Sequence, residues 1–175
     1  MKLTTIRHTS VEVPSSTCYG FTDVPLKPSF QSEAETVKSQ LTGETFDKVY
    51  SSPLSRCTLL AEYCGYPSPI LDPRLKELNF GDWEMKSWME IGKQEAAAWL
   101  SDWINCPAKN GESYRMMQER VNAFMDELKS SDAQSVVVFT HAGVIRLIHV
   151  YLGFFQLENS FEFPVEYGQI FEFNI

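Results

Sequence analysis

Two histidines and two arginines occur where they could act together on a phosphate ester. Arg7 and His8 follow one short apolar run, Arg56 follows a second, and His141 follows a third. An arginine is permanently charged, and its planar fork matches the oxygens of a phosphate. A neutral histidine can attack phosphorus and carry the phosphoryl group, which divides one difficult displacement into two easier ones. These residue types therefore predict phosphoryl transfer through a covalent histidine.

Each of these residues taken singly has a plainer structural interpretation. Arg56 could be a solvated helix residue, and His141 could be a hydrogen-bonded core histidine. His149 lies in an apolar segment and is expected to be such a structural histidine. The chemical interpretation depends on the other residues meeting in the fold.

The pattern of the chain supplies elements that would bring them together. Short apolar strands are expected at 3–7, 46–50, 135–140 and 169–173, and helices at 30–41, 54–64, 88–104, 114–129 and 142–152. A long loop rich in proline, glycine and serine is expected at 10–28, and a largely irregular segment at 71–83. Strands that alternate with helices predict an α/β fold with a mostly parallel sheet. Ligands of such sheets bind outside the carboxyl ends of the strands, where these residues fall.

Length and composition narrow the class of protein. The 175 residues fit a single domain spanning 1–175, and the net charge of -8 argues against nucleic acid or an anionic membrane surface as a partner. No apolar run approaches the roughly 20 residues that span a bilayer, so a cytoplasmic protein is expected. The four cysteines show no C-x-x-C pair, which favours reduced thiols over a metal site. We expect no metal and no cofactor.

Four short segments carry a resemblance to a known family. They are 3–9 with its Arg-His pair, 51–57 (SSPLSRC), 74–84 (RLKELNFGDWE) and 140–143 (THAG). In that order they resemble the motifs of the histidine phosphatase superfamily, the phosphoglycerate-mutase-like proteins. The resemblance extends over nearly the whole chain. It implies a three-layer α/β/α sandwich with a mostly parallel central sheet.

The resemblance also implies roles for individual residues. His8 matches the histidine that accepts the phosphoryl group, and Glu77 matches the acid that protonates the leaving oxygen. Arg7, Arg56 and His141 match the phosphate pocket, where His141 would donate to a phosphate oxygen. Without the resemblance, Glu77 would be interpreted as a surface carboxylate on a loop.

Neighbouring residues are expected to assist. Thr9 stands where the family usually has glycine and could offer a hydroxyl to the substrate. Ala142 begins a helix whose free N–H groups favour an anion. Glu84 is expected to tie its own loop to nearby backbone, and Glu112 and Ser113 to cap the helix that follows them.

The segment 17–26 (TCYGFTDVPL) suggests a substrate. It is similar to the CYGxxDVPL stretch of α-ribazole phosphatases, which remove the 5′-phosphate of α-ribazole phosphate during assembly of the lower nucleotide loop of cobalamin. Tyr19 and Phe21 could stack on a flat base, or they could equally anchor the loop. One alternative is a broad-specificity phosphatase of small organic phosphates. The other is a phosphoglycerate mutase, which the short chain disfavours.

Two other classes of protein fit the sequence less well. A phosphate-binding scaffold without turnover would be free to lose His8, Glu77 or His141, and all three are present. A metallohydrolase is disfavoured because the three histidines form no known ligand pattern. The expected partner is thus a small-molecule phosphate ester.

Overall fold

The computed structural model describes all 175 residues, and its centre is one five-stranded sheet. The strands are β1 (Lys2–Arg7), β2 (Lys48–Ser51), β3 (Ile70–Leu71), β4 (Ser135–Thr140) and β5 (Ile170–Asn174). Their order across the sheet is β3-β2-β4-β1-β5. Strands β1 to β4 run parallel, and β5 pairs antiparallel with β1 at one edge. The expected mostly parallel sheet is confirmed.

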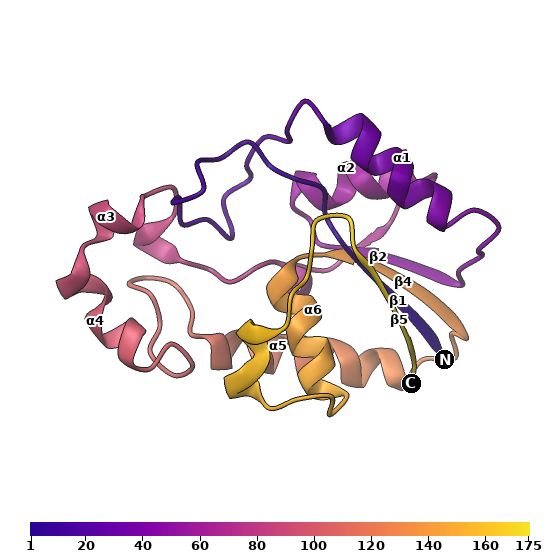
Figure 1. Cartoon of the computed structure of the whole chain (residues 1–175). Coiled ribbons are helices and arrows are strands. Elements are labelled where there is room, and N and C mark those ends of the chain that lie inside the picture. The colour runs from indigo at the N-terminus through magenta and orange to yellow at the C-terminus, as the bar shows by residue number, and fades with distance from the viewer.

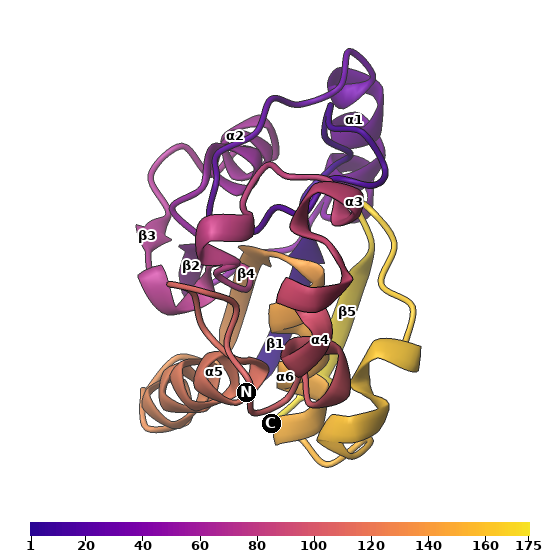
Figure 2. The ribbon, with the colours of Figure 1, turned by 90° about the vertical axis from the view of Figure 1, so that its left-hand side faces the viewer.

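Six helices accompany this sheet, and four of them cover its two faces. The six helices are α1 (Phe30–Gln40), α2 (Ser55–Tyr63), α3 (Trp88–Ile91), α4 (Lys93–Ser101), α5 (Tyr114–Lys129) and α6 (Ala142–Tyr151). Figure 1 shows α1 and α2 on one face and α5 and α6 on the other, which is the expected α/β/α sandwich. In Figure 2, α3 and α4 form an arm that stands in front of the sheet.

The central strand β4 shows why both faces must be covered. Successive side chains of a strand point to opposite faces, so an uninterrupted apolar run fills two cores. Val136 and Val138 pack with α5 and α6, whereas Val137 and Phe139 pack with α1 and α2. All four are fully buried. The sheet therefore lies between two separate hydrophobic cores.

Three parts of the chain differ from the sequence-based expectation. The helix expected at 88–104 is interrupted at Gly92, whose φ of 74° suits glycine and ends α3. The segment 71–83, expected to be irregular, begins with the last residue of the two-residue β3 and contains the 3-10 turns η1 (Pro73–Leu75) and η2 (Gly81–Trp83). A further 3-10 segment, η3 (Leu157–Glu162), had no sequence signal.

The structure has no membrane-spanning helix and no cluster of metal-ligating side chains. None of its helices has both the length and the apolar character needed to cross a membrane. No group of three or more His, Cys, Asp or Glu side chains is placed to hold a metal ion. All four cysteines are free thiols.

Candidate active site

The carboxyl ends of the three central strands meet at one edge, as the sequence predicts. The parallel register pairs Arg7 at the end of β1 with Thr140 at the end of β4. His8 and His141 follow directly, and Arg56 lies in the first turn of α2, just beyond β2. A cavity of about 220 Å³ opens here, and Arg7, His8 and Arg56 all line it.

His8 is held as a neutral imidazole with one nitrogen free. Its Nδ1–H donates to the carbonyl of Thr9 at 2.7 Å, which leaves the lone pair of Nε2 unpaired. Burial, and then the positive charges of Arg56 and Arg7, hold the pKa of His8 well below its usual value. The ring is 3% exposed. A buried neutral imidazole with a free nitrogen is the form that can attack phosphorus.

His141 lies against His8 behind the cavity wall. Its ring centroid is 5.1 Å from that of His8, and the side chain is fully buried. Arg56 Nε–H donates to Nδ1 of His141 at 3.3 Å, so the proton of the neutral ring sits on Nε2, which donates to Ser52 Oγ at 2.8 Å. Burial and the neighbouring Arg56 lower the pKa of His141. His141 does not itself line the cavity.

The positive charges of Arg7 and Arg56 are not neutralised within the protein. Arg56 donates to the carbonyls of Thr22 and Gly20 at 2.9 and 2.6 Å, and Arg7 donates to that of Val165 at 2.5 Å. Neither forms an ion pair with a carboxylate of the protein. Their fixed positions and free N–H groups make this side of the cavity an anion site.

Glu77 reaches the same cavity from the segment between η1 and η2. Its Oε2 accepts from the backbone N–H of Gly143 at 3.2 Å, and its Oε1 accepts from that of Leu78 at 3.1 Å. A Cβ on Gly143 would lie 2.2 Å from Glu77 Oε1, so only glycine allows the carboxylate to lie over the start of α6. The one carboxylate lining the cavity is therefore fixed by the helix that follows His141.

Glu84 fixes the 10–28 loop beside the cavity, as predicted. Its carboxylate accepts from the backbone N–H groups of Gly20, Phe21, Thr22 and Phe80 at 2.9–3.1 Å. Burial opposes ionisation, but these hydrogen bonds outweigh it and lower the pKa of Glu84. One side chain thus joins the loop to the segment that carries Glu77.

Replacing Glu84 with glutamine should destabilise the protein by ~2 kcal/mol at pH 7, because charge-assisted hydrogen bonds to backbone are lost. A carboxylate with a lowered folded-state pKa stabilises above its unfolded pKa and loses that contribution as pH falls through the folded value. The difference in unfolding free energy between wild type and E84Q should therefore shrink below about pH 4.5. Urea unfolding at pH 7 and pH 4 measures this, and a difference that is equal at both pH values would contradict it.

The remaining predicted residues fall in different places. Ala142 and Tyr19 line the cavity, and Tyr19 shares a hydrogen bond with the hydroxyl of Tyr167 at 3.2 Å. Thr9 is fully buried, does not line the cavity, and its hydroxyl has no partner. Phe21 packs beneath the ammonium of Lys76 instead of facing the cavity.

Ser113 and His149 have the structural roles expected of them, whereas the expected role of Glu112 needs correction. Ser113 caps α5 by accepting from the N–H of Met116. Glu112, which was also expected at this cap, instead pairs with Arg120 and accepts from the N–H of Asn79. His149 donates from Nδ1 to the carbonyl of the residue one turn earlier, and its ring packs among five phenylalanines.

Two polar residues of the cavity had not been singled out from the sequence. Arg146 lines the cavity, donates to the carbonyl of Phe163 at 2.9 Å and forms no ion pair. Its spacing of four residues from Ala142 places both on one face of α6, a signal that could have found it. Tyr114 is 1% exposed, and its hydroxyl has no hydrogen-bond partner. No pattern in the sequence marks Tyr114.

Comparison with known proteins agrees with this geometry. The family model of the histidine phosphatase superfamily (branch 1) matches residues 3–175. The adenosylcobalamin/alpha-ribazole phosphatase of Salmonella typhimurium is 33% identical over 96% of this chain and 87% of its own. The protein of the same name from Escherichia coli K12 is 30% identical with the same coverage. The crystal structure of the alpha-ribazole phosphatase from Shigella flexneri superposes with a TM-score of 0.91 at 27% identity, covering 100% of this chain and 91% of that one.

The family match extends over the strands and helices that build the cavity and over the segments that supply His8, His141, the arginines and Glu77. The relatives match the chain over almost its full length. The chain belongs to branch 1 of the histidine phosphatase superfamily, and it is a phosphatase.

Proposed function

We propose that this protein removes the 5′-phosphate of α-ribazole phosphate, a step in cobalamin nucleotide-loop assembly, through a phosphohistidine at His8. The observation that supports the chemistry is the free Nε2 of a neutral His8 in a cavity with arginines and one carboxylate. The support for the substrate is the name shared by two relatives at 30–33% identity and by the Shigella flexneri structure.

The first half-reaction transfers the phosphoryl group to His8. Arg7 and Arg56 bind the phosphate oxygens, and the lone pair of His8 Nε2 forms a bond to phosphorus as the bond to the ester oxygen breaks. The proton of the Glu77 carboxyl goes to the departing oxygen. The carbonyl of Thr9 holds the Nδ1 proton of the phosphorylated ring. His141 supports the transferring group once its Nε2–H turns from Ser52 to a phosphate oxygen.

The second half-reaction releases phosphate. A water molecule attacks phosphorus, its proton goes to the Glu77 carboxylate, and the bond from phosphorus to Nε2 breaks. His8 is again neutral, Glu77 again carries its proton, and inorganic phosphate leaves. The cycle needs no cofactor.

Substrate preference tests this proposal. We expect a higher kcat/KM for α-ribazole 5′-phosphate than for 3-phosphoglycerate or glucose phosphates. Phosphate release across that panel measures it. Equal values across the panel would instead support the alternative, a broad-specificity phosphatase.

Activity should survive complete removal of divalent metal ions. The guanidinium groups of Arg7 and Arg56 supply the positive charge that a metal ion provides in other phosphoryl-transfer enzymes. The measurement is kcat/KM after dialysis against EDTA, before and after magnesium or zinc is restored. A loss on chelation that added metal reverses would contradict the proposal.

The setting of the reaction is also part of the proposal. Four free thiols suit the reducing cytoplasm, where we place the enzyme. A net charge of -8 favours a small phosphate ester over a nucleic-acid partner, because the positive charge of the site is local.

A further inference from the structure

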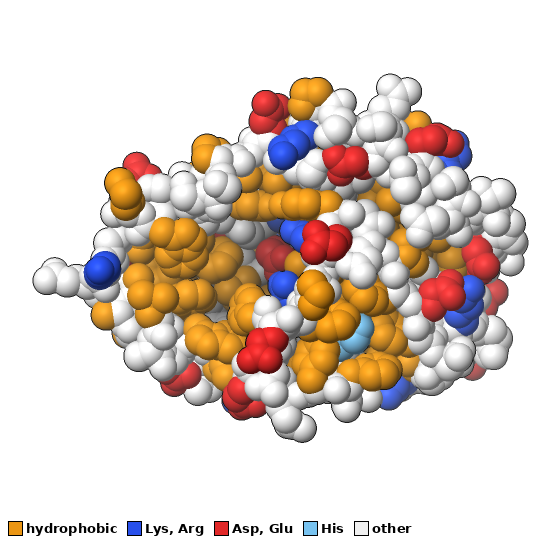
Figure 3. All heavy atoms as spheres, in the orientation of Figure 1, with side chains coloured by type: hydrophobic (Ala, Val, Ile, Leu, Met, Phe, Trp, Pro, Cys, Tyr) orange, Lys and Arg blue, Asp and Glu red, His pale blue; other side chains and the backbone are white.

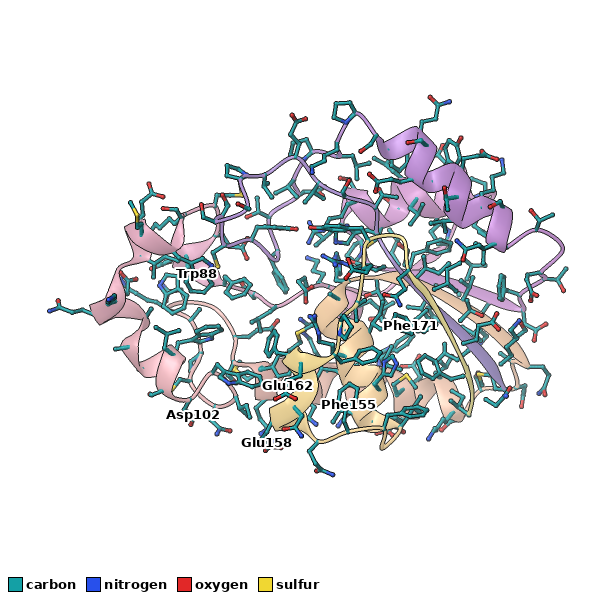
Figure 4. All side chains as sticks on the ribbon, viewed as in Figure 1. Trp88, Asp102, Phe155, Glu158, Glu162 and Phe171 are labelled. Carbon is teal, nitrogen blue, oxygen red and sulfur yellow. The ribbon has the colours of Figure 1, made fainter.

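A second hollow adjoins the active-site cavity and has no part in the chemistry above. It holds about 390 Å³ and lies between α4 and η3, lined by Trp99, Leu100, Trp103, Glu158, Phe161 and Glu162. Figure 3 shows hydrophobic side chains gathered around a recess on this face, beside the charged groups at its centre. In Figure 4, Glu158 and Glu162 extend from η3, and Asp102 marks the end of the facing helix α4.

Phe161 forms the wall between the two spaces, because it lines both. Toward the active site it lies 5.1 Å from the Tyr114 ring and 5.4 Å from the Arg146 guanidinium. Toward the hollow it meets Trp103 edge to face at 4.6 Å. The side chain is 47% exposed, so part of its surface is free for contact.

The active-site cavity is too small for the whole proposed substrate. Pockets for drug-sized ligands are typically about 300–1,000 Å³, and this cavity is about 220 Å³. With phosphate at His8 and a sugar beside Arg146 and Tyr114, the base must lie outside it. Burial raises the pKa of Tyr114, so its hydroxyl keeps its proton and can donate to a sugar oxygen.

We propose that the hollow behind Phe161 binds the flat aromatic ring of the leaving group, an inference that rests on the proposed phosphatase function. Aromatic side chains stack on any planar heterocycle, and Trp99, Trp103 and Phe161 supply that surface. The hollow carries two carboxylates and no cation, so it disfavours anionic rings. The base then lies away from the 10–28 loop.

The loop residues offer much less stacking surface than the hollow. Phe21 is covered by Lys76 and Arg120 and does not line the cavity. Tyr19 lines it, but its hydroxyl is bonded to Tyr167 and its ring lies 5.6 Å from the Arg56 guanidinium. Tyr19 is therefore on the phosphate side of the site, whereas Phe161 lines both the cavity and the hollow.

The test compares two substrates that share sugar and phosphate but differ in the ring. The quantity is the ratio of kcat/KM for α-ribazole 5′-phosphate to kcat/KM for ribose 5-phosphate. Phe161→Leu should lower this ratio ~10-fold, which corresponds to about 1.4 kcal/mol of lost stacking. Phe161→Tyr should keep it. Leu100→Arg, at a position that is 58% exposed, should lower it by filling the hollow without disturbing the core.

The matched control is Phe154→Leu, which removes an aromatic ring that is 64% exposed and lines neither space. Its ratio should equal that of the wild type. An unchanged ratio in both Phe161→Leu and Leu100→Arg would overturn the inference while leaving the phosphatase function intact. If the wild-type ratio is already near one, the ring contributes nothing and the inference fails. If neither compound is hydrolysed, the proposed function fails first.

Discussion

Replacing His8 with alanine should lower kcat/KM by on the order of 10⁴-fold or more for every substrate, because no other group can take its place as nucleophile. His8 Nε2 is the only unpaired histidine nitrogen that faces the cavity, since His141 lies behind it. Steady-state phosphate release measures the loss. Thermal unfolding should show that the variant still folds.

The third histidine supplies the control. His149 is buried away from the cavity, with its ring among phenylalanines, so His149→Leu should retain turnover. Full activity in His8→Ala would refute the covalent mechanism. If both variants lost activity and also failed to fold, the result would show only that each histidine is structural. The folding measurement therefore separates loss of the nucleophile from loss of the fold.

The environment of His8 also sets the expected pH dependence. Burial beside Arg56 and Arg7 lowers its pKa well below the usual 6.5, so the ring stays neutral at and below that pH. The acidic limb of kcat/KM, once corrected for ionisation of the substrate's own phosphate, reports the free enzyme and should therefore lie well below pH 6.5. A limb centred near 6.5 would mean that the neutral form is not stabilised in the site.

Replacing Glu77 with glutamine should slow hydrolysis of a sugar phosphate by ~10²–10⁴-fold, the usual contribution of a general acid. An alkoxide leaves a phosphate ester poorly, and Glu77 is the carboxyl group that lines the cavity. The amide of glutamine can keep the contact with the start of α6 but cannot give up a proton. The leaving oxygen would then depart without help.

The same variant should hydrolyse p-nitrophenyl phosphate at close to the wild-type rate of phosphoryl transfer, because p-nitrophenolate needs no proton to leave. The comparison of the two substrates in single-turnover kinetics isolates the acid role. Equal slowing of both would show that Glu77 only shapes the pocket, and the acid would have to be sought elsewhere.

Much of the fold followed from the sequence because its signals are local. The buried run of β4 and the Ser113 cap at the start of α5 appear where the pattern indicates. The interruption at Gly92 was missed because a glycine inside a helical pattern does not by itself reveal a positive φ. Strand β3 was missed because it consists of only Ile70 and Leu71, which is too short to show the alternation of a strand.

The position of a candidate site residue could be predicted from the sequence where a strand end fixes it. Arg7 and His8 line the cavity because β1 ends there. Thr9 does not line the cavity, because its side chain is fully buried beneath the surface. Tyr114 could not be foreseen, since its position depends on how α5 packs against α6 and η3.

Rapid quench with phosphate-labelled substrate tests the covalent mechanism most directly. During turnover the protein should carry an acid-labile, base-stable label, and fragmentation should place it on the peptide that contains His8. His8→Ala should carry none. Turnover of the wild type at full rate with no trapped label at any quench time, or a label on another residue, would contradict the account.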